Sequence, residues 1–343
     1  MTVASAEPPV PAPVATVGLP RRPGKVSLGL AAVLVVAAVG PFLVSDYHVS
    51  KLTQLVVYVI ALLGLNLLTG FSGQISLGNG AFYALGAYAS AIGMAQGGLP
   101  YWATPPLAGA VCFLAGYLFG RPAARLEGLY LALATFALAI TTPQILKLDA
   151  LERWTGGNQG VQIARPASPI PGQVSDDQWL YFFCLAVAAV MFVVAWNLVR
   201  GRTGRALVAL RDHPIAAGTM GIDVASRKAV TFGVSAMFTG IAGALGALVT
   251  GFISPDSFAI FLSIQLLVGG VVGGIASLAG ALFGAAFIEF VPDLANRLSE
   301  AAPSALYGVL LIVCMMVMPG GAAGLVRSAR AWLARRSHPR TRS

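Results

Sequence analysis

Residues 70–88 read GFSGQISLGNGAFYALGAY and stand between two long apolar runs. The stretch is rich in Gly and Ala and has no charged residue, yet it holds Ser72, Gln74, Ser76 and Asn79. Hydrocarbon offers such groups no hydrogen-bond partners, so the segment must be buried in protein or line a watery path. Small residues also let neighbouring helices approach closely. We therefore expect Gln74, Ser76 and Asn79 to line a translocation path; the alternative is a tightly packed helix pair without a transport role.

The composition of the whole chain indicates an all-α polytopic membrane protein. Of its 343 residues, 57% are hydrophobic and only 10% are charged, whereas soluble domains carry about 25% charged residues. A bilayer core takes roughly 20 apolar residues per helix. Ten candidate spans follow, near residues 26–45, 52–69, 74–96, 103–120, 126–147, 178–199, 229–251, 259–276, 279–297 and 304–320. The glycines in the last part leave open whether residues 259–297 form two spans or include a re-entrant segment.

The basic residues predict the orientation of the chain. With ten spans and a cytoplasmic N-terminus, most of the 22 Lys and Arg residues fall in cytoplasmic segments, as the positive-inside rule requires. Both termini are then cytoplasmic. We expect a disordered Pro-rich tail over residues 1–25, a transmembrane domain over 26–326 and a basic tail over 327–343 at the lipid surface. This arrangement accounts for the net charge of +9 without nucleic acid.

Two loops are longer than a simple connection needs, and long loops in compact folds are usually functional. One covers about residues 148–177 on the outside and contains TGGNQG at 155–160; the other covers about 200–228 in the cytoplasm. Plain linkers are the alternative interpretation. A weak internal repeat is also visible, because Gly70, Gly73, Ile75, Gly80 and Ala81 recur as Gly270, Gly273, Ile275, Gly280 and Ala281.

The cytoplasmic loop carries the signals of a short helix. Pro214 suits a first helical position, and Gly221 sits where helices commonly end. A helix this short is marginal alone, so we expect it to dock on a partner protein; lying on the lipid surface is the alternative. The docking segment comprises Arg211, Asp212, Pro214, Ala216, Ala217 and Gly221.

No pattern in the chain predicts catalysis. The Cys and His residues have no metal or disulfide spacing, no Ser-His-Asp cluster is evident, and residues 18–26 lack the spacing and the Ser/Thr of a phosphate loop. We therefore expect no metal, no cofactor and no enzymatic site. Glu289 is the clearest ionisable residue inside a span, which by default suggests function. With Asp293 and Arg297 it also fits a charged stripe running to the outer surface.

Four segments together resemble a known family. They are residues 70–88, RLEGLYLALATFALA at 125–139, TGGNQG at 155–160, and RALVALRDHPIAAGTMGIDVASRKAVTFGVSAMFTGIAGAL at 205–245. They are similar to the permease subunits of bacterial branched-chain amino acid ABC importers of the LivM type. The similarity runs from about residue 50 to 326, and the cytoplasmic loop and residues 70–88 are its most specific parts.

The resemblance implies an inner-membrane subunit that works with four partners. These are a second permease in a heterodimer, two ATP-binding subunits that use the ATP, and a periplasmic solute-binding protein. It also implies that residues 211–221 form the coupling helix on the ATPase. We expect the external loop to contact the binding protein through Thr155, Gly156, Gly157, Asn158 and Gly160. A urea or short-chain amide importer is the nearest alternative, and an ATP-independent secondary transporter is a more distant one.

Overall fold

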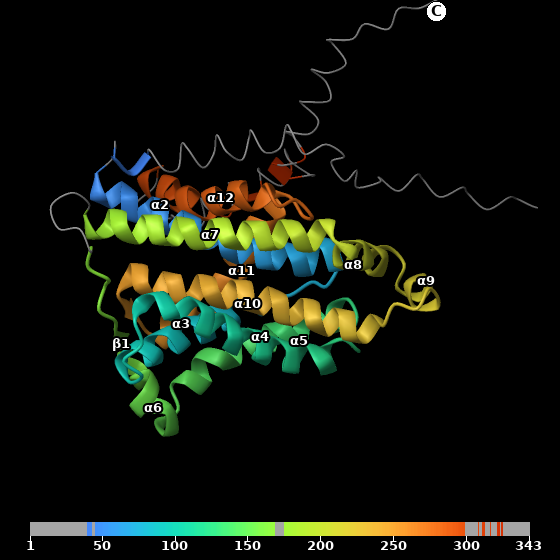
Figure 1. Cartoon of the computed structure of the whole chain (residues 1–343), viewed down its shortest axis with the longest axis horizontal. Coiled ribbons are helices and arrows are strands. Elements are labelled where there is room, and N and C mark those ends of the chain that lie inside the picture. The colour runs from blue at the N-terminus through green and yellow to red at the C-terminus, as the bar shows by residue number, and fades with distance from the viewer. Residues whose placement is uncertain are drawn as a thin grey trace, which may run out of the picture. The chain divides into compact units, whose positions relative to one another are not determined.

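The computed structural model describes residues 40–42, 45–168 and 175–298, together with positions 308, 311, 312, 316, 321, 322 and 324. The tails predicted at 1–25 and 327–343 lie outside the described residues, as do most of the spans predicted at 26–45 and 304–320. The described part is built mainly of helices (Figure 1), which agrees with the all-α class expected from the composition.

The longer helices, in chain order, are α2 (Asp46–Leu65), α3 (Asn79–Ala95), α4 (Thr104–Ala123), α5 (Leu129–Leu146), α7 (Asp176–Arg200), α10 (Val224–Thr250), α11 (Ile260–Gly273) and α12 (Gly280–Leu298). The shorter ones are η1 (Gly40–Phe42), the π-helix η2 (Asn66–Phe71), η3 (Tyr101–Ala103), α6 (Asp149–Thr155), η4 (Gly157–Gln159), α8 (Arg202–Asp212), α9 (Pro214–Thr219) and η5 (Pro255–Phe258). Strand β1 (Val161–Gln162) pairs antiparallel with β2 (Phe252–Ile253), with Val161 opposite Ile253.

The short elements lie at two opposite ends of the long helices. In Figure 1, α6 and β1 lie at one end, and α8 and α9 lie at the other. We call these the β1 end and the α9 end. The starts of α2 and α7 belong to the β1 end, where the Ser175 hydroxyl lies 3.2 Å from a carboxylate oxygen of Asp46.

Helix α10 occupies the core and packs against α2, α3 and α4. Its most apolar 18-residue window is 89% buried, against 28% for α5 and for α7. Glycines allow this close packing: a Cβ on Gly86 of α3 would overlap the carbonyl of Gly240 in α10, and one on Gly120 of α4 would lie 2.9 Å from the Cβ of Phe232. The small residues thus bring backbones together, as expected for membrane helices.

Six described helices are long and apolar enough to cross a membrane, so the predicted count of ten is not confirmed. They are Asp46–Phe71, Tyr101–Ala123, Leu129–Leu146, Asp176–Arg200, Val224–Thr250 and Pro255–Gly273. Helices α3 and α12 lie at two further predicted spans, but α3 has only 17 residues and α12 carries charged residues. The multi-pass character is confirmed by these helices.

One boundary differs from the expectation, and it lies at a break between helices. The span predicted at 74–96 begins only at Asn79, because residues 73–78 are not helical and Gly73 has a φ of 74°. Residues 259–297 form two helices, α11 and α12, separated by a second break at residues 274–279. The amide of Asn66 donates to the carbonyl of Ser277 over 3.3 Å, so the two breaks lie next to each other. The residues of the weak repeat lie in and beside these two breaks.

Candidate functional site

The first break is held by its own polar side chains. The Gln74 amide donates to the Ser72 hydroxyl at 2.8 Å and to the carbonyl of Lys228 at 3.4 Å. The Ser72 hydroxyl donates to the carbonyl of Leu68 at 2.7 Å. Thr69 donates to the backbone carbonyl of Gln74 at 3.1 Å. These bonds replace the helical hydrogen bonds lost where the chain turns from the π-helix to residues 73–78.

Neighbouring helices satisfy the rest of the break. The Ser76 hydroxyl lies 3.2 Å from the amide oxygen of Asn79, and the amide nitrogen of Asn79 lies 3.4 Å from the hydroxyl of Thr239 in α10. The backbone N–H of Leu77 donates to Thr135 of α5 at 3.0 Å. Non-helical backbone at membrane depth is tolerated only when such partners exist.

The sequence analysis did not predict that hydroxyl side chains in otherwise apolar helices would supply these hydrogen-bond partners. Besides Thr135 and Thr239, Ser263 of α11 accepts from the N–H of Gly80 at 2.9 Å. The only signal for them was a lone hydroxyl residue in an apolar run, which is common in membrane helices. All three are buried.

The three predicted path residues are buried in this conformation. Gln74, Ser76 and Asn79 are 4%, 1% and 3% exposed. The structure places them in two hydrogen-bonded groups that both reach α10: Gln74 bonds to Lys228, and Ser76 with Asn79 reaches Thr239. These hydrogen bonds stabilise the packing around the first break, and a path-lining role stays a prediction that requires these groups to separate.

At the α9 end, the loop between α7 and α10 forms the two short helices α8 and α9. Helix α9 begins at Pro214 as the sequence predicts, and Gly221, with a φ of 81°, follows its end. Ile215 and Met220 are 86% and 84% exposed, whereas Ala217 is buried, with 4% of its surface exposed. Of the predicted docking residues, Ala216 faces outward and Ala217 does not.

Arg211 points back into the helices instead of outward. Its guanidinium donates to the carbonyl of Gly70 at 3.0 Å and, through Nε, to Asp212 at 2.9 Å. A Cβ on Gly73 would lie 2.8 Å from the Cγ of Arg211, so that glycine leaves room for the arginine stem. Arg211 therefore ties the α8–α9 loop directly to the first break.

At the β1 end, residues 155–160 are folded tightly. Gly156, Gly157 and Gly160 have φ values of 70°, 53° and 75°, a region that non-glycine residues rarely adopt. The hydroxyl of Thr155 donates to the carbonyl of Leu146 at 2.8 Å and accepts from Gly157 at 3.2 Å. Thr155 and Gly157 are thus buried, and Asn158 with Gln159 forms the exposed tip.

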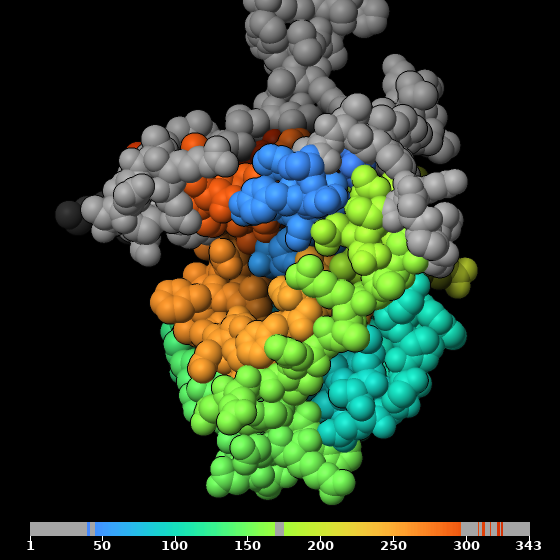
Figure 2. All heavy atoms as spheres, turned by 90° about the vertical axis from the view of Figure 1, so that its left-hand side faces the viewer, coloured from blue at the N-terminus to red at the C-terminus, as the bar shows by residue number. Residues whose placement is uncertain are grey.

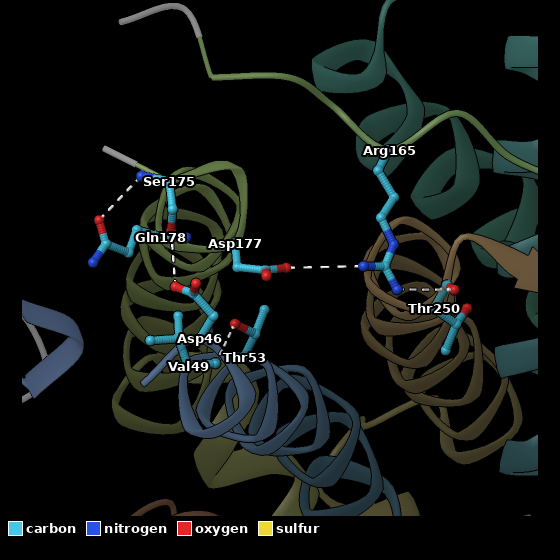
Figure 3. A network of polar contacts seen from close by, with 8 residues as sticks. All are labelled: Asp46, Val49, Thr53, Arg165, Ser175, Asp177, Gln178 and Thr250. Carbon is cyan, nitrogen blue, oxygen red and sulfur yellow. Dashed lines mark hydrogen bonds and ion pairs between the residues drawn. The ribbon is translucent and has the colours of Figure 1, made fainter. Parts of the chain in front are cut away.

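The segment after this turn joins α7 to α10 at the β1 end. Arg165 lies 3.9 Å from Asp177 at the start of α7 and donates to the carbonyl of Thr250 at 3.3 Å at the end of α10 (Figure 3). Ser175 connects α7 to Asp46 of α2 in the same view. Figure 2 looks onto this end, where green residues of α6 and β1 adjoin the orange residues that follow α10.

A charged cluster joins α2 to α12 in the half of the helices nearer the β1 end. Lys51 forms an ion pair with Asp293, and the Lys51 Nζ also lies 3.7 Å from a carboxylate oxygen of Glu289. The side chains of Lys51 and Glu289 are 21% and 11% exposed. Glu289 therefore has an ion-pair partner on α2, so its role is not limited to a charged stripe along α12.

Among the described residues, no group of three or more His, Cys, Asp or Glu side chains is placed to hold a metal ion. Cys112 and Cys184 are buried free thiols, and Cys314 lies outside the described residues. Buried cysteines of this kind act as small packing residues.

Apolar spanning helices around polar, glycine-rich helix breaks are features of membrane transport proteins. The comparisons define the class further. A family model described as "Branched-chain amino acid transport system / permease component" matches residues 47–319. The high-affinity branched-chain amino acid transport system permease protein LivM of Salmonella typhimurium is 35% identical over 326 residues, covering 88% of this chain and 76% of that protein. The Escherichia coli K12 LivM protein is 34% identical over the same shares.

The permease protein LivH of the same Escherichia coli system is more distant, at 24% identity over 78% of this chain and 91% of LivH. No solved structure matches the chain. The chain belongs to the family of branched-chain amino acid transport system permease components. The resemblance to LivM-type permeases is thereby confirmed, and the chain is a transport protein of a multi-subunit system rather than an enzyme.

Proposed function

We propose that this chain is one permease subunit of an ABC importer in a bacterial inner membrane, carrying branched-chain amino acids delivered by a periplasmic binding protein. Family membership and the substrate named for its LivM relatives support this proposal. A LivH-type permease is the proposed second subunit, since both kinds belong to one named system in Escherichia coli. Two ATP-binding subunits supply the energy, because this chain has no phosphate loop.

The α9 end faces the cytoplasm in this proposal. Arginines gather in α8, at the end of α7 and at the start of α10, and cytoplasmic segments of membrane proteins carry the Lys/Arg excess. The β1 end then faces the periplasm. Both chain termini lie in the cytoplasm if the predicted spans at 26–45 and 304–320 are present.

Helix α9 is the proposed contact with an ATP-binding subunit. The observation that carries this proposal is a pair of large apolar side chains that are almost fully exposed: Ile215 on this six-residue helix, and Met220 directly after its end. Ordering so short a helix is unfavourable unless packing repays it, and a groove on a partner would cover these side chains.

Arg211 is the proposed link from that contact to the path. A movement of α8 and α9 would pull on the carbonyl of Gly70 through the 3.0 Å hydrogen bond. That carbonyl lies in the π-helix η2 just before the first break, and in the break itself Gln74 holds the backbone of Lys228 in α10. Separating the hydrogen-bonded groups at this break would expose Gln74, Ser76 and Asn79 to water, as their predicted path-lining role requires.

The experiment compares two substitutions of equal charge in the assembled transporter. Ile215→Asp places a carboxylate in the proposed contact, whereas Ala225→Asp places one on an exposed residue in the first turn of α10, at the same end of the molecule. We expect Ile215→Asp to lower uptake of leucine into ATP-loaded proteoliposomes at least about tenfold, which corresponds to the roughly 1.4 kcal/mol that desolvating an unpaired charge readily exceeds. Equal uptake by both variants would contradict the assignment, and uptake by wild type without ATP would favour a secondary transporter.

The proposed contact with the binding protein is at the tip of the β1 end. Asn158 and Gln159 are exposed there, with Trp154 beside them at 49% exposure. Replacing Asn158 and Gln159 together with Ala should reduce the stimulation of ATPase activity by loaded binding protein while basal activity stays unchanged. Raised basal activity instead would indicate that the loop only closes the path from outside. Wild-type stimulation by a urea-loaded but not by a leucine-loaded binding protein would favour the amide importers.

A further inference from the structure

Helix α12 is anchored firmly in its first half. A Cβ on Gly284 would overlap the carbonyl of Gly269 in α11, and it would lie 3.0 Å from the Cδ1 of Leu62 in α2. A Cβ on Gly273 of α11 would likewise overlap the carbonyl of Gly280 at the start of α12. Backbones that lie this close together leave no room for sliding. The first half of α12 therefore belongs to one packed unit with α11 and α2.

The second half of α12 is joined to α2 by charged side chains instead. Lys51 of α2 forms ion pairs with Asp293 and with Glu289, and the three side chains are 21%, 35% and 11% exposed. Charges at membrane depth are costly and by default indicate a function. This contact differs from glycine packing, because water that reaches the separated charges solvates them and offsets the loss of the ion pairs. The second half of α12 can therefore separate from α2 where the first half cannot.

A proline divides the two carboxylates of this cluster. Pro292 lies inside α12, after Glu289 and directly before Asp293. Proline has no N–H, so the carbonyl of Ile288 loses its helical donor, and sharp bends in helices are usually found at such positions. Lys51 therefore bridges the two sides of a weak point in α12. We call residues 292–298, beyond this point, the end segment of α12.

The end segment lies at the β1 end and packs against the molecule. Its Asp293 pairs with Lys51, which is five residues from the start of α2 at Asp46, or about 8 Å along the helix at 1.5 Å per residue. Within the segment, Ala295 is 0% exposed, so its methyl group is covered in this conformation. The segment therefore lies against neighbouring residues while Lys51 holds Asp293.

We infer that Lys51 is the latch of a periplasmic gate, and that the end segment of α12 is its moving part. The inference rests on the proposed function, which assigns the β1 end to the periplasm. In this conformation the latch is closed. Opening separates Lys51 from Asp293 and Glu289, and the end segment turns about Pro292 while the first half of α12 stays packed on α11. The seam between α2 and the end segment then opens on the side from which the binding protein delivers the amino acid.

Two cysteine reporters on α12 test the moving part. Ala295→Cys lies in the end segment and Ala285→Cys in the anchored half, and both alanines are 0% exposed. Each is introduced into the whole importer after the native cysteines of this chain have been replaced, and a membrane-impermeant thiol reagent is added from the periplasmic side of sealed vesicles. Each reporter is combined with Lys51→Met, which opens the latch, or with Lys147→Met. Lys147 is the matched control, because it forms an ion pair with Asp256 at the same end but joins α5 to η5.

We expect Lys51→Met to raise the labelling rate of the Ala295→Cys reporter at least about tenfold, because losing one partner of a buried ion pair shifts an equilibrium by more than that. Tenfold is a lower bound that suits partly exposed side chains. The Ala285→Cys reporter should stay unlabelled in every variant, and Lys147→Met should keep the wild-type rates. Exchanging the charges, by Lys51→Asp together with Asp293→Lys, should restore the slow rate, since a lysine at position 293 then faces a carboxylate at position 51.

A cross-link across the latch tests its role in transport and does not depend on the stability of Lys51→Met. In the reconstituted importer, a short bis-methanethiosulfonate reagent joins Lys51→Cys to Asp293→Cys through disulfides, and in the control it joins Lys147→Cys to Asp256→Cys. We expect the cross-link across the latch to lower ATP-driven leucine uptake at least about tenfold, because a covalent bond removes the open state from the ensemble. Cleavage by a reductant should restore uptake, and the control cross-link should leave uptake unchanged.

Equal labelling of Ala295→Cys in the wild type and in Lys51→Met would overturn the gate. Equal labelling of both reporters in Lys51→Met would overturn it too, because all of α12 would then have loosened. Full uptake by the cross-linked latch, or equal loss of uptake in both cross-linked pairs, would also contradict it. If Lys51→Met does not assemble, the cross-links decide. Failure of the wild type to carry any branched-chain amino acid would instead refute the proposed function, while the labelling would still report whether the end segment moves.

Discussion

A methyl group added at Gly86 should weaken the α3–α10 contact. Its Cβ would overlap the carbonyl oxygen of Gly240 and lie 2.5 Å from the Gly240 Cα and 2.6 Å from its carbonyl carbon. Backbone atoms cannot yield as a side-chain end can, so the helices must separate. Overpacking costs about 1–3 kcal/mol, and the higher helix propensity of Ala returns about 0.5–1 kcal/mol. We expect Gly86→Ala to destabilise the protein by about 1–2 kcal/mol.

Gly93 supplies the control on the same helix. A Cβ at Gly93 would lie 3.3 Å from the Cδ1 of Leu99 and from the Cδ2 of Leu107, both of which are mobile ends of side chains. Gly93→Ala should therefore match or exceed the wild-type stability. The melting temperatures of both variants are measured by thermal unfolding of the purified permease complex in the same detergent. A change of 1 kcal/mol in the free energy of unfolding should shift the melting temperature by about 2–4 °C. Equal melting temperatures for the two variants would refute the packing argument.

Three further predictions concern single contacts, and each is measured by the same thermal unfolding. Lys51→Met should destabilise the protein more than Glu289→Gln, because it leaves two carboxylates of α12 without their partner. Removing one member of a buried ion pair is costly. A larger drop in melting temperature for Glu289→Gln would contradict the role of Lys51 in this cluster. Thr155→Val should cost about 1–3 kcal/mol, because the buried N–H of Gly157 loses its acceptor, and an unaltered melting temperature would argue against that bond. Ala276→Gly should stabilise by up to about 1 kcal/mol, since glycine adopts a φ of 62° without the Cβ clash; a lower melting temperature would show that the strain is not relieved.

Much of the helical architecture follows from local patterns. Apolar runs place the cores of α4, α5, α7 and α10 within a few residues of the predicted spans, because a run of apolar side chains needs no particular partner to prefer the bilayer. Pro214 marks the start of α9, since a proline at a first helical position loses no hydrogen bond. The family resemblance rests on the same local motifs, and the comparisons confirm it.

The positions of the two helix breaks could not be predicted from local sequence patterns. Residues 73–78 carry no charge and lie between two apolar runs, so the predicted span began too early. The chain can leave the helix there because Thr135, Thr239 and Ser263 supply hydrogen-bond partners from other helices. Those partners are 58 to 183 residues away along the chain, and no pattern in the stretch itself predicts them.

The sequence by itself determined the class of this protein, its apolar spans, its basic loop and its family. These properties depend on which side chains are present and on their spacing along the chain. Only the tertiary structure decided which polar groups meet. It turned Arg211 inward to the carbonyl of Gly70, buried Thr155 under its own turn, and paired Lys51 with Glu289. The physical reason is that a hydrogen bond or an ion pair needs two groups within about 3–4 Å, and helix packing brings together residues that the sequence separates.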